Sequence, residues 1–354
     1  MEFMSAREAS NLWGISQRRV AVLCSENRIS GAKFLGNMWL IPQNASKPDD
    51  GRTHRNIKAN NGEAKPFLKW AGGKGQLLKE ISFYYPFNEQ IKKYAEPFVG
   101  GGAVLFDILN KYELEEIYIS DVNAELINTY QVIRNNVDDL LEILLKYQNE
   151  YLPLDTEERK IYYLAKRDRF NELKFLKTDN KIEKAALTIF LNKTCFNGLY
   201  RVNRKGLFNV PMGAYKNPCI CDCDNLRNVS RKMQNVNIIL GDYKQAAGFI
   251  DDATFAYFDP PYRPINTTSS FTSYTENSFD DEHQVELSVF VREMAERGAK
   301  VVVSNSDPKN INENDDFFDD IYADLQIKRV EATRMINSKS SKRGKIKELL
   351  ISNY

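Results

Sequence analysis

Residues 253–258 form the segment that most limits what this chain can fold into. The run, Ala-Thr-Phe-Ala-Tyr-Phe, carries no charge and predicts a buried strand. Directly after it come Asp259, Pro260, Pro261 and Tyr262, where the prolines end the strand in a stiff turn. A buried strand must be covered by other helices or strands, and the rest of the chain contains segments that could form them.

Strand and helix candidates alternate from Pro66 onward, which predicts an α/β fold with a mostly parallel, Rossmann-like sheet. The predicted strands cover residues 93–98, 117–120, 236–240, 254–258 and 300–304. The predicted helices between them cover residues 103–111, 124–135 and 282–298.

Residues 155–218 interrupt this alternation. They predict helices at 156–175 and 182–192, followed by a basic, hairpin-like piece. We therefore expect an inserted lobe at 155–218, with one main domain formed by residues 66–154 and 219–354.

The first 43 residues are predicted to form a separate module, followed by a linker at 44–65. A capping box at 5–8 opens a short helix, a second helix covers residues 17–25, and a hairpin follows. This order resembles the winged helix-turn-helix modules of the excisionase and MerR type, in which Arg18 and Arg19 would face DNA. The alternative is a small protein-docking domain.

Charge indicates a polyanionic partner only locally. Over its 354 residues the chain has a net charge of +1, so overall charge indicates no such partner. Residues 192–218 nevertheless contain several Lys and Arg residues and no Asp or Glu, and residues 338–347 are also basic. Because nearby charge outweighs distant charge in salt, these stretches can still bind phosphates.

Cysteine usage and hydropathy bear on location and metal content. No apolar run is long enough to span a membrane and no signal-peptide pattern is present, so we expect a cytoplasmic protein. Five cysteines need not pair in a reducing compartment. Cys219, Cys221 and Cys223 form C-x-C-x-C, which favours free thiols over zinc because the spacing is not C-x-x-C.

The tetrad at 259–262 suits the transfer of an electrophile to the amino group of a nucleobase. The lone pair of that amine is delocalised into the ring, so the amine is a poor nucleophile. The Asp259 carboxylate and the Pro260 carbonyl can accept both N–H groups and help to localise the lone pair. Tyr262 offers a flat face on which a base drawn out of a duplex can stack. The alternative is an ordinary strand that ends in a proline turn.

A second set of residues predicts a site for a nucleoside-bearing methyl donor. The segment 96–102, Glu-Pro-Phe-Val-Gly-Gly-Gly, is a glycine turn between a strand and a helix. Asp121 ends the next strand and can bind ribose hydroxyls, while Asp242 can bind the amino group of an adenine that lies against Tyr243. A nicotinamide cofactor is disfavoured because the turn is not G-x-G-x-x-G and no partnered histidine is near.

The block 67–74, Phe-Leu-Lys-Trp-Ala-Gly-Gly-Lys, adds two candidates. Trp70 can pack against the donor, and Lys74 can meet its carboxylate. The alternative is a glycine-rich turn that caps the sheet.

From Pro66 to Tyr354 the chain resembles the DNA adenine-N6 methyltransferases of the Dam type, in class α. The 67–74 block, the glycine turn, the inserted lobe and the tetrad occur here in the family's order, together with Asn-Gly-Leu-Tyr-Arg at 197–201 and Phe-Asn-Val-Pro at 208–211. The resemblance implies that Asp259, Pro260 and Tyr262 hold a flipped adenine. It also implies an S-adenosylmethionine site lined by Trp70, Lys74, Phe98, Gly100, Asp121, Asp242 and Tyr243.

The same resemblance implies roles in sequence recognition. Phe196 would wedge into the base stack and Asn197 would contact the opened site, while Leu199 would meet a thymine methyl. Arg201 would bind guanine O6 and N7, and Lys69 would read the outer base pair. Phe196 stands where some relatives have Tyr. The alternatives are that Phe196 and Leu199 form hairpin core and that Arg201 binds phosphate only.

We therefore expect a methyltransferase that modifies adenine N6 in double-stranded DNA, within GATC, by base flipping. The expected donor is S-adenosylmethionine, no metal is required, and a cognate restriction endonuclease is a candidate partner in a bacterial or phage setting. The alternatives are a cytosine-N4 methyltransferase, which more often carries Ser at the first tetrad position, an RNA adenine methyltransferase, and a DNA-binding regulator with an inactive methyltransferase fold.

Overall fold

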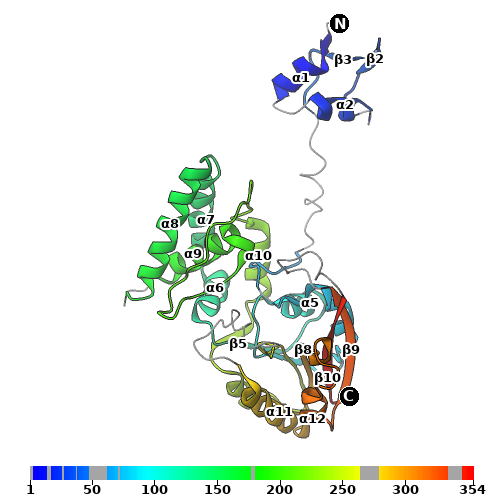
Figure 1. The fold of residues 1–354 in the computed structure, drawn as a ribbon, viewed down its shortest axis with the longest axis vertical. Coiled ribbons are helices and arrows are strands. Elements are labelled where there is room, and N and C mark those ends of the chain that lie inside the picture. Colours follow the sequence, from blue (N-terminus) through cyan, green and yellow to red (C-terminus); the bar gives the residue numbers. More distant parts are fainter. Residues whose placement is uncertain are drawn as a thin grey trace. The chain divides into compact units, whose positions relative to one another are not determined.

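In a computed structural model, the chain divides into two compact units, Met1–Asn61 and Gly62–Tyr354 (Figure 1). The structure describes residues 3–13, 17–25, 28–36, 38–47, 62–70, 72–176, 180–263, 279–333 and 345–354.

The first unit contains two helices and a small antiparallel sheet. Its helices are α1 (Ala6–Trp13) and α2 (Gln17–Ser25), and its strands are β1 (Phe3–Ser5), β2 (Lys33–Leu35) and β3 (Met38–Pro42), in the order β1-β3-β2. The predicted capping box is present, because the Ser5 N–H donates to Glu8 Oε2 at 2.7 Å and the Glu8 N–H donates to Ser5 Oγ at 3.3 Å. Both helices lie where the sequence predicted them, whereas β1 was not predicted.

The second unit is built on a seven-stranded sheet in the order β6-β5-β4-β7-β8-β10-β9. Its strands are β4 (Lys93–Glu96), β5 (Glu116–Asp121), β6 (Val236–Leu240), β7 (Thr254–Phe258), β8 (Lys300–Ser306), β9 (Gln326–Thr333) and β10 (Lys345–Ser352). The first five strands in that order pair in parallel, and β10 pairs antiparallel with β8 and β9. The predicted mostly parallel α/β sheet is confirmed.

Helices cover both faces of this sheet (Figure 1). Along β7, Phe255 and Tyr257 pack into one core, whereas Ala256 and Phe258 pack into the other, since successive side chains of a strand point to opposite faces. The helices are α4 (Leu78–Ser82), α5 (Ala103–Lys111), α6 (Ala124–Asn135), α7 (Val137–Tyr151), α8 (Thr156–Leu173), α9 (Lys181–Thr194), α10 (Cys223–Lys232), α11 (Asp281–Glu296) and α12 (Phe317–Ile321).

A helical layer beside α6 carries the segment that leads to residue 196. Here α9 packs against α6, α7 and α8, and most of its residues are buried. Asp155 caps α8 by accepting from the Glu157 and Glu158 N–H groups at 2.9 Å each. The chain leaves α9 at Thr194, so this packing fixes where the following turn begins.

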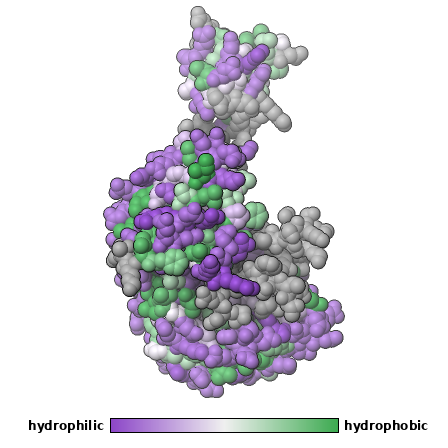
Figure 2. Space-filling view, turned by 60° about the vertical axis from the view of Figure 1, so that its left-hand side comes forward, coloured by the Kyte–Doolittle hydropathy of each residue, from purple (hydrophilic) through white to green (hydrophobic). Residues whose placement is uncertain are grey.

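The surface in Figure 2 is mainly hydrophilic, with apolar residues interspersed among polar ones. Among the helices that the structure describes, none is both long and apolar enough to cross a membrane.

Candidate active site and DNA-contact surface

The candidate site lies where the strand order reverses. From β4 the chain moves outward to β5 and then β6, and it later returns to place β7 on the other side of β4. In open parallel sheets, ligands bind outside the carboxyl ends of the strands at such a switch point. The glycine turn follows β4 and the tetrad follows β7, so the two predicted halves of the site flank this point.

Asp259 is held at the switch point by two side chains. Lys74 Nζ lies 2.7 Å from Asp259 Oδ1, and Ser304 Oγ donates to the same oxygen at 2.9 Å. Burial raises the pKa of Asp259, against the opposing effect of the Lys74 charge. Since both contacts use Oδ1, Oδ2 is the oxygen that can accept from a substrate.

Tyr262 belongs to the same group of contacts. Its hydroxyl accepts from Lys74 Nζ at 2.6 Å and donates to Glu348 Oε2, on β10, also at 2.6 Å. The ring is partly exposed, and Lys74 Nζ lies 4.5 Å from its centroid. Lys74 was predicted to meet a donor carboxylate, but here it contacts Asp259, Tyr262 and the Gly72 carbonyl.

Buried amides hold the backbone of the tetrad. Gln284, on α11, donates from Nε2 to the Pro261 carbonyl at 3.0 Å, and Asn305 Nδ2 donates to Gln284 Oε1 at 3.2 Å. Both amide side chains are fully buried. The sequence reasoning missed Gln284, Ser304 and Asn305, because polar residues on a predicted helix or strand carry no local sign of a partner so distant in sequence.

The glycine turn has the conformation that its residues permit. Gly100 has φ 47° and Gly102 has φ 70°, in the left-handed region that favours glycine. A Cβ on Gly100 would lie 2.9 Å from Trp70 Cδ1, so Trp70 covers this part of the turn. Asp121 accepts from the Gly100 N–H at 3.1 Å and from the Asn123 N–H at 2.9 Å, and burial raises its pKa.

The aromatic candidates stack on each other. The rings of Phe98 and Tyr243 lie 5.4 Å apart at 27°, and Tyr243 is buried whereas Phe98 is partly exposed. Phe98 therefore presents the accessible face of this pair, although the sequence analysis had expected Tyr243 to do so. Asp242 begins the short helix η3 (Tyr243–Gly248), where it accepts from the Lys244 N–H at 2.7 Å.

Glu96 is a buried acid beside the switch point that sequence reasoning quoted but did not use. It ends β4 with 3% of its surface exposed, and Tyr94 Oη donates to its Oε2 at 2.7 Å. Burial raises the pKa of Glu96 to about 8, and the Asp259 charge adds to the increase. Glu96 is therefore protonated at neutral pH.

A tight turn presents the predicted wedge. The Leu199 N–H donates to the Phe196 carbonyl at 3.3 Å, and Asn197 (φ 56°) and Gly198 (φ 64°) both have positive φ. This combination is that of a type I′-like turn, for which Asn-Gly is the preferred pair. Phe196 is 52% exposed, whereas Leu199 is partly buried against the core.

The basic candidates lie on the surface with partners of their own. Arg201 is exposed, and Asn209 accepts from its Nε at 2.8 Å and, through the backbone carbonyl, from its NH2 group at 3.3 Å. Lys69 Nζ donates to Tyr215 Oη at 3.2 Å and lies 4.4 Å from that ring. The side chains of Arg18 and Arg19 lie outside the described part of the structure.

The cysteines do not form a metal site in the described structure. All five are free thiols, and the sulfur atoms of Cys221 and Cys223 lie 3.2 Å apart. Among the described residues, no group of three or more His, Cys, Asp or Glu side chains is placed to hold a metal ion.

Comparison with known proteins assigns the chain to a family. A family model described as D12 class N6 adenine-specific DNA methyltransferase matches residues 70–336. The Type II methyltransferase M.MjaIII of Methanocaldococcus jannaschii is 51% identical over 296 residues, which cover 82% of this chain and 100% of that protein. The DNA adenine methylase of Escherichia coli strain K12 is 32% identical, over 81% of this chain and 94% of that protein.

A second Type II methyltransferase, M1.LlaDCHI of Lactococcus lactis subsp. cremoris, is 38% identical over 84% of this chain and 98% of that protein. A solved precorrin 8W decarboxylase from Methanobacterium thermoautotrophicum aligns over 82% of this chain and 95% of that chain, with 11% identity and a TM-score of 0.32, too low to bear on the fold. The family match and the curated relatives agree with the tetrad and the glycine turn: the chain belongs to the D12 class of N6 adenine-specific DNA methyltransferases, and it is an enzyme that methylates adenine in DNA.

Proposed function

We propose that this enzyme transfers a methyl group from S-adenosylmethionine to N6 of an adenine that is flipped out of double-stranded DNA, within GATC. The observation that carries the proposal is the meeting of the glycine turn and the tetrad at one topological switch point, where Lys74 bridges from the donor side to Asp259 and Tyr262.

The carboxyl edge of the sheet has the chemistry that this donor needs. S-adenosylmethionine supplies an electrophilic methyl group on a sulfonium. The glycine turn follows β4, Asp121 ends β5, Asp242 follows the neighbouring strand β6, and Phe98 offers an accessible ring. The residues that would bind the donor are Trp70, Lys74, Phe98, Gly100, Asp121, Asp242 and Tyr243.

The tetrad would receive the adenine. Asp259 Oδ2 and the Pro260 carbonyl accept the two amino protons, and Tyr262 stacks on the base. Lys74 and Ser304 fix the carboxylate through Oδ1, and Gln284 fixes the Pro261 carbonyl, so the acceptors are in place before the reaction. Once N6 is methylated it must lose one proton, and the raised pKa of Asp259 supports Oδ2 as its first acceptor.

The turn that begins at Phe196 would enter the DNA. Its exposed aromatic ring at the tip of a tight turn suits a wedge between base steps, and Asn209 pre-orients the Arg201 guanidinium. Leu199 is partly buried, which supports a packing role more than contact with a thymine methyl. The residues that would contact DNA are Lys69, Phe196, Asn197 and Arg201, with Arg18 and Arg19 in the first unit.

We assign residues 66–154 and 219–354 to the catalytic domain, 155–218 to target recognition and 44–65 to a linker. Residues 1–43 would form a winged helix-turn-helix that adds DNA affinity, which its two helices and hairpin support. Because two of the relatives are named Type II methyltransferases, a restriction endonuclease that cuts the same site is the expected biological partner.

A plasmid methylation assay tests the proposal. Plasmid treated with the enzyme and S-adenosylmethionine should resist a nuclease that cuts only unmethylated GATC and become sensitive to one that cuts only methylated GATC. Nucleoside mass spectrometry should find N6-methyladenine and no N4-methylcytosine.

The matched control is Asp259→Ala. It should reduce methyl transfer by at least about 10³-fold, because it removes a pre-oriented acceptor, while duplex binding changes little. Protection of a different sequence from nuclease cleavage would refute GATC as the recognised sequence. A nearly fully active Asp259→Ala enzyme would refute the role given to the tetrad.

A further inference from the structure

Asparagine side chains hold the segment that enters the catalytic unit. Residues 63–69 belong to no strand, and their backbone groups bond to amides on helices instead. Three of these residues are held by both their N–H and their C=O, at distances of 2.8–3.0 Å: Ala64 by Asn110, Lys65 by Asn225, and Lys69 by Asn192.

Asn192 differs from the other two because it makes a third bond. Its Nδ2 donates to the Gly198 carbonyl at 2.9 Å as well as to the Lys69 carbonyl at 2.8 Å. The side chain is buried, so neither bond is easily replaced by water. One amide therefore joins the donor-side segment to the turn that carries Phe196.

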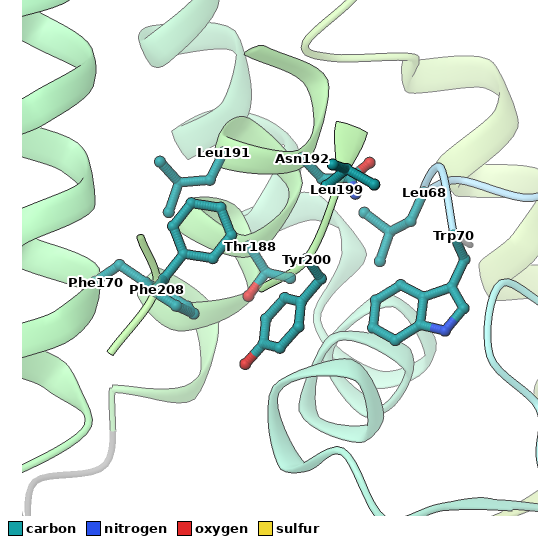
Figure 3. A pocket seen from close by; sticks show the side chains of 9 residues that line it. All are labelled: Leu68, Trp70, Phe170, Thr188, Leu191, Asn192, Leu199, Tyr200 and Phe208. Carbon is teal, nitrogen blue, oxygen red and sulfur yellow. The ribbon is translucent and has the colours of Figure 1, made fainter. Parts of the chain in front are cut away.

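Two further contacts tighten the same junction. Gly198 lies so close to Lys69 that a Cβ there would be 2.5 Å from Lys69 Cδ. Trp70 stacks on Tyr200 with the ring centroids 5.7 Å apart at 27°, and Figure 3 shows the two rings side by side next to Leu68 and Leu199. The junction is thus made of the Asn192 amide bonds, the close approach of Gly198 to Lys69, and the stacked rings of Trp70 and Tyr200.

Each end of this junction leads to a different part of the reaction. On one side, the chain runs from Lys69 through Trp70, which covers the glycine turn, to Lys74, which pairs with Asp259. On the other side it runs from Gly198 to Arg201. A shift of the turn relative to Lys69 would therefore move the DNA-reading residues relative to the acceptors that hold the adenine.

We propose that Asn192 is a positioning residue for sequence discrimination: it keeps the turn at 196–201 in register with the donor-side segment, so that only a correctly read site presents its adenine to Asp259. This inference rests on the proposed function, in which the turn at 196–201 contacts bases. The physical reason is geometric, because a displacement of about 1 Å can reduce the rate of a positioned reaction by on the order of 10²-fold.

The test is Asn192→Asp, with Asn225→Asp as the matched control. In Asn192→Asp the Lys69 N–H keeps an acceptor, but the two bonds from Nδ2 are lost and an oxygen faces the carbonyls of Lys69 and Gly198. Asn225→Asp makes the same change in an equally buried clamp on Lys65, which has no bond to the turn. Both variants should lose stability, and only Asn192→Asp should alter the junction.

The readout is the ratio of kcat/KM on a GATC duplex to that on a duplex in which the G·C pair assigned to Arg201 is changed, measured well below each variant's melting midpoint. We expect Asn192→Asp to lower this ratio by about tenfold or more, comparable to the loss of one base-reading pair. Asn225→Asp should keep the wild-type ratio. An unchanged ratio in Asn192→Asp, or an equal loss in both variants, would overturn the inference.

Arg201→Ala separates this inference from the proposed function. If Arg201→Ala keeps the wild-type ratio, the turn does not read those bases and the proposed recognition fails first. If Arg201→Ala lowers the ratio and Asn192→Asp does not, recognition stands and the role of Asn192 is wrong.

Asn192→Ala, with Asn225→Ala as its control, provides a second route if Asn192→Asp does not fold. It removes all three bonds of the Asn192 amide without placing a charge in the buried junction. The same loss of discrimination is expected, and a wild-type ratio would overturn the inference.

Discussion

Glu96 makes the stability of this enzyme depend on pH in a direction opposite to that of most carboxylates. The side chain is buried at the end of β4, with Tyr94 Oη as its hydrogen-bond donor. Burial raises its pKa from the ordinary value of 4.5 to about 8. Over this range the folded protein keeps a proton that the unfolded chain releases.

The sign and size of the effect follow from this difference in bound protons. The folded state binds more protons, so the free energy of unfolding falls as pH rises, by about 1.4 kcal/mol per pH unit at most. The contribution is complete below the unfolded pKa and is lost as pH rises through the folded one. Between pH 6 and pH 8 the loss from Glu96 should be about 2 kcal/mol.

Glu96→Gln isolates the effect, because it keeps an acceptor for Tyr94 Oη and cannot ionise. Urea unfolding followed by circular dichroism at pH 6 and pH 8 measures the free energy for both proteins. Titrating groups that are not coupled to Glu96 contribute equally to both, so the difference between the two pH dependences belongs to Glu96 and its coupling to Asp259. If the variant and the wild type lose the same free energy between these pH values, the assignment of a proton to buried Glu96 is wrong.

Two further outcomes test the site and the first unit. Ser304→Ala removes one of the two contacts to Asp259 Oδ1. We expect kcat to fall about tenfold with little change in the KM for DNA, because the carboxylate is then less well positioned. A change confined to KM would contradict this. Deleting residues 1–61 should weaken duplex binding and make that binding less dependent on salt. The rate of methylation of a short duplex at saturating DNA should stay the same. Unchanged duplex affinity in an electrophoretic shift assay would refute a DNA-binding role for the first unit.

Much of the fold was predictable because local patterns and tertiary burial agree. The strand β7 and the helices α2, α5 and α6 begin and end where the sequence predicted, since each has a continuous or periodic apolar pattern. The chain belongs to the predicted family. This membership supports an adenine-modifying enzyme over a cytosine-N4 methyltransferase and over an inactive regulator.

The misses have physical reasons too. Strands β9 and β10 mix Lys, Arg and Glu with apolar residues, so neither segment shows a clear strand-like alternation of apolar and polar residues. They add to the edge of the parallel sheet in the antiparallel direction. The contacts that fix the site join residues far apart in sequence, such as Ser304 with Asp259 and Lys69 with Asn192. The residues around each partner contain no pattern from which the other partner could be predicted. Lys74 was assigned to the donor alone, whereas its pairing with Asp259 depends on two loops meeting at the switch point.

The left-handed backbone of Asn197 limits which replacements at this position are informative. An alanine there would remove the amide and also strain the bend, so a loss of activity would not say which of the two mattered. Glycine accepts the bend and lacks the amide. Aspartate also accepts the bend, but it replaces the NH₂ donor of the amide with a second acceptor oxygen. The replacements that keep this bend without large strain are therefore mainly glycine and aspartate, and a comparison of these two variants reports on the side chain alone.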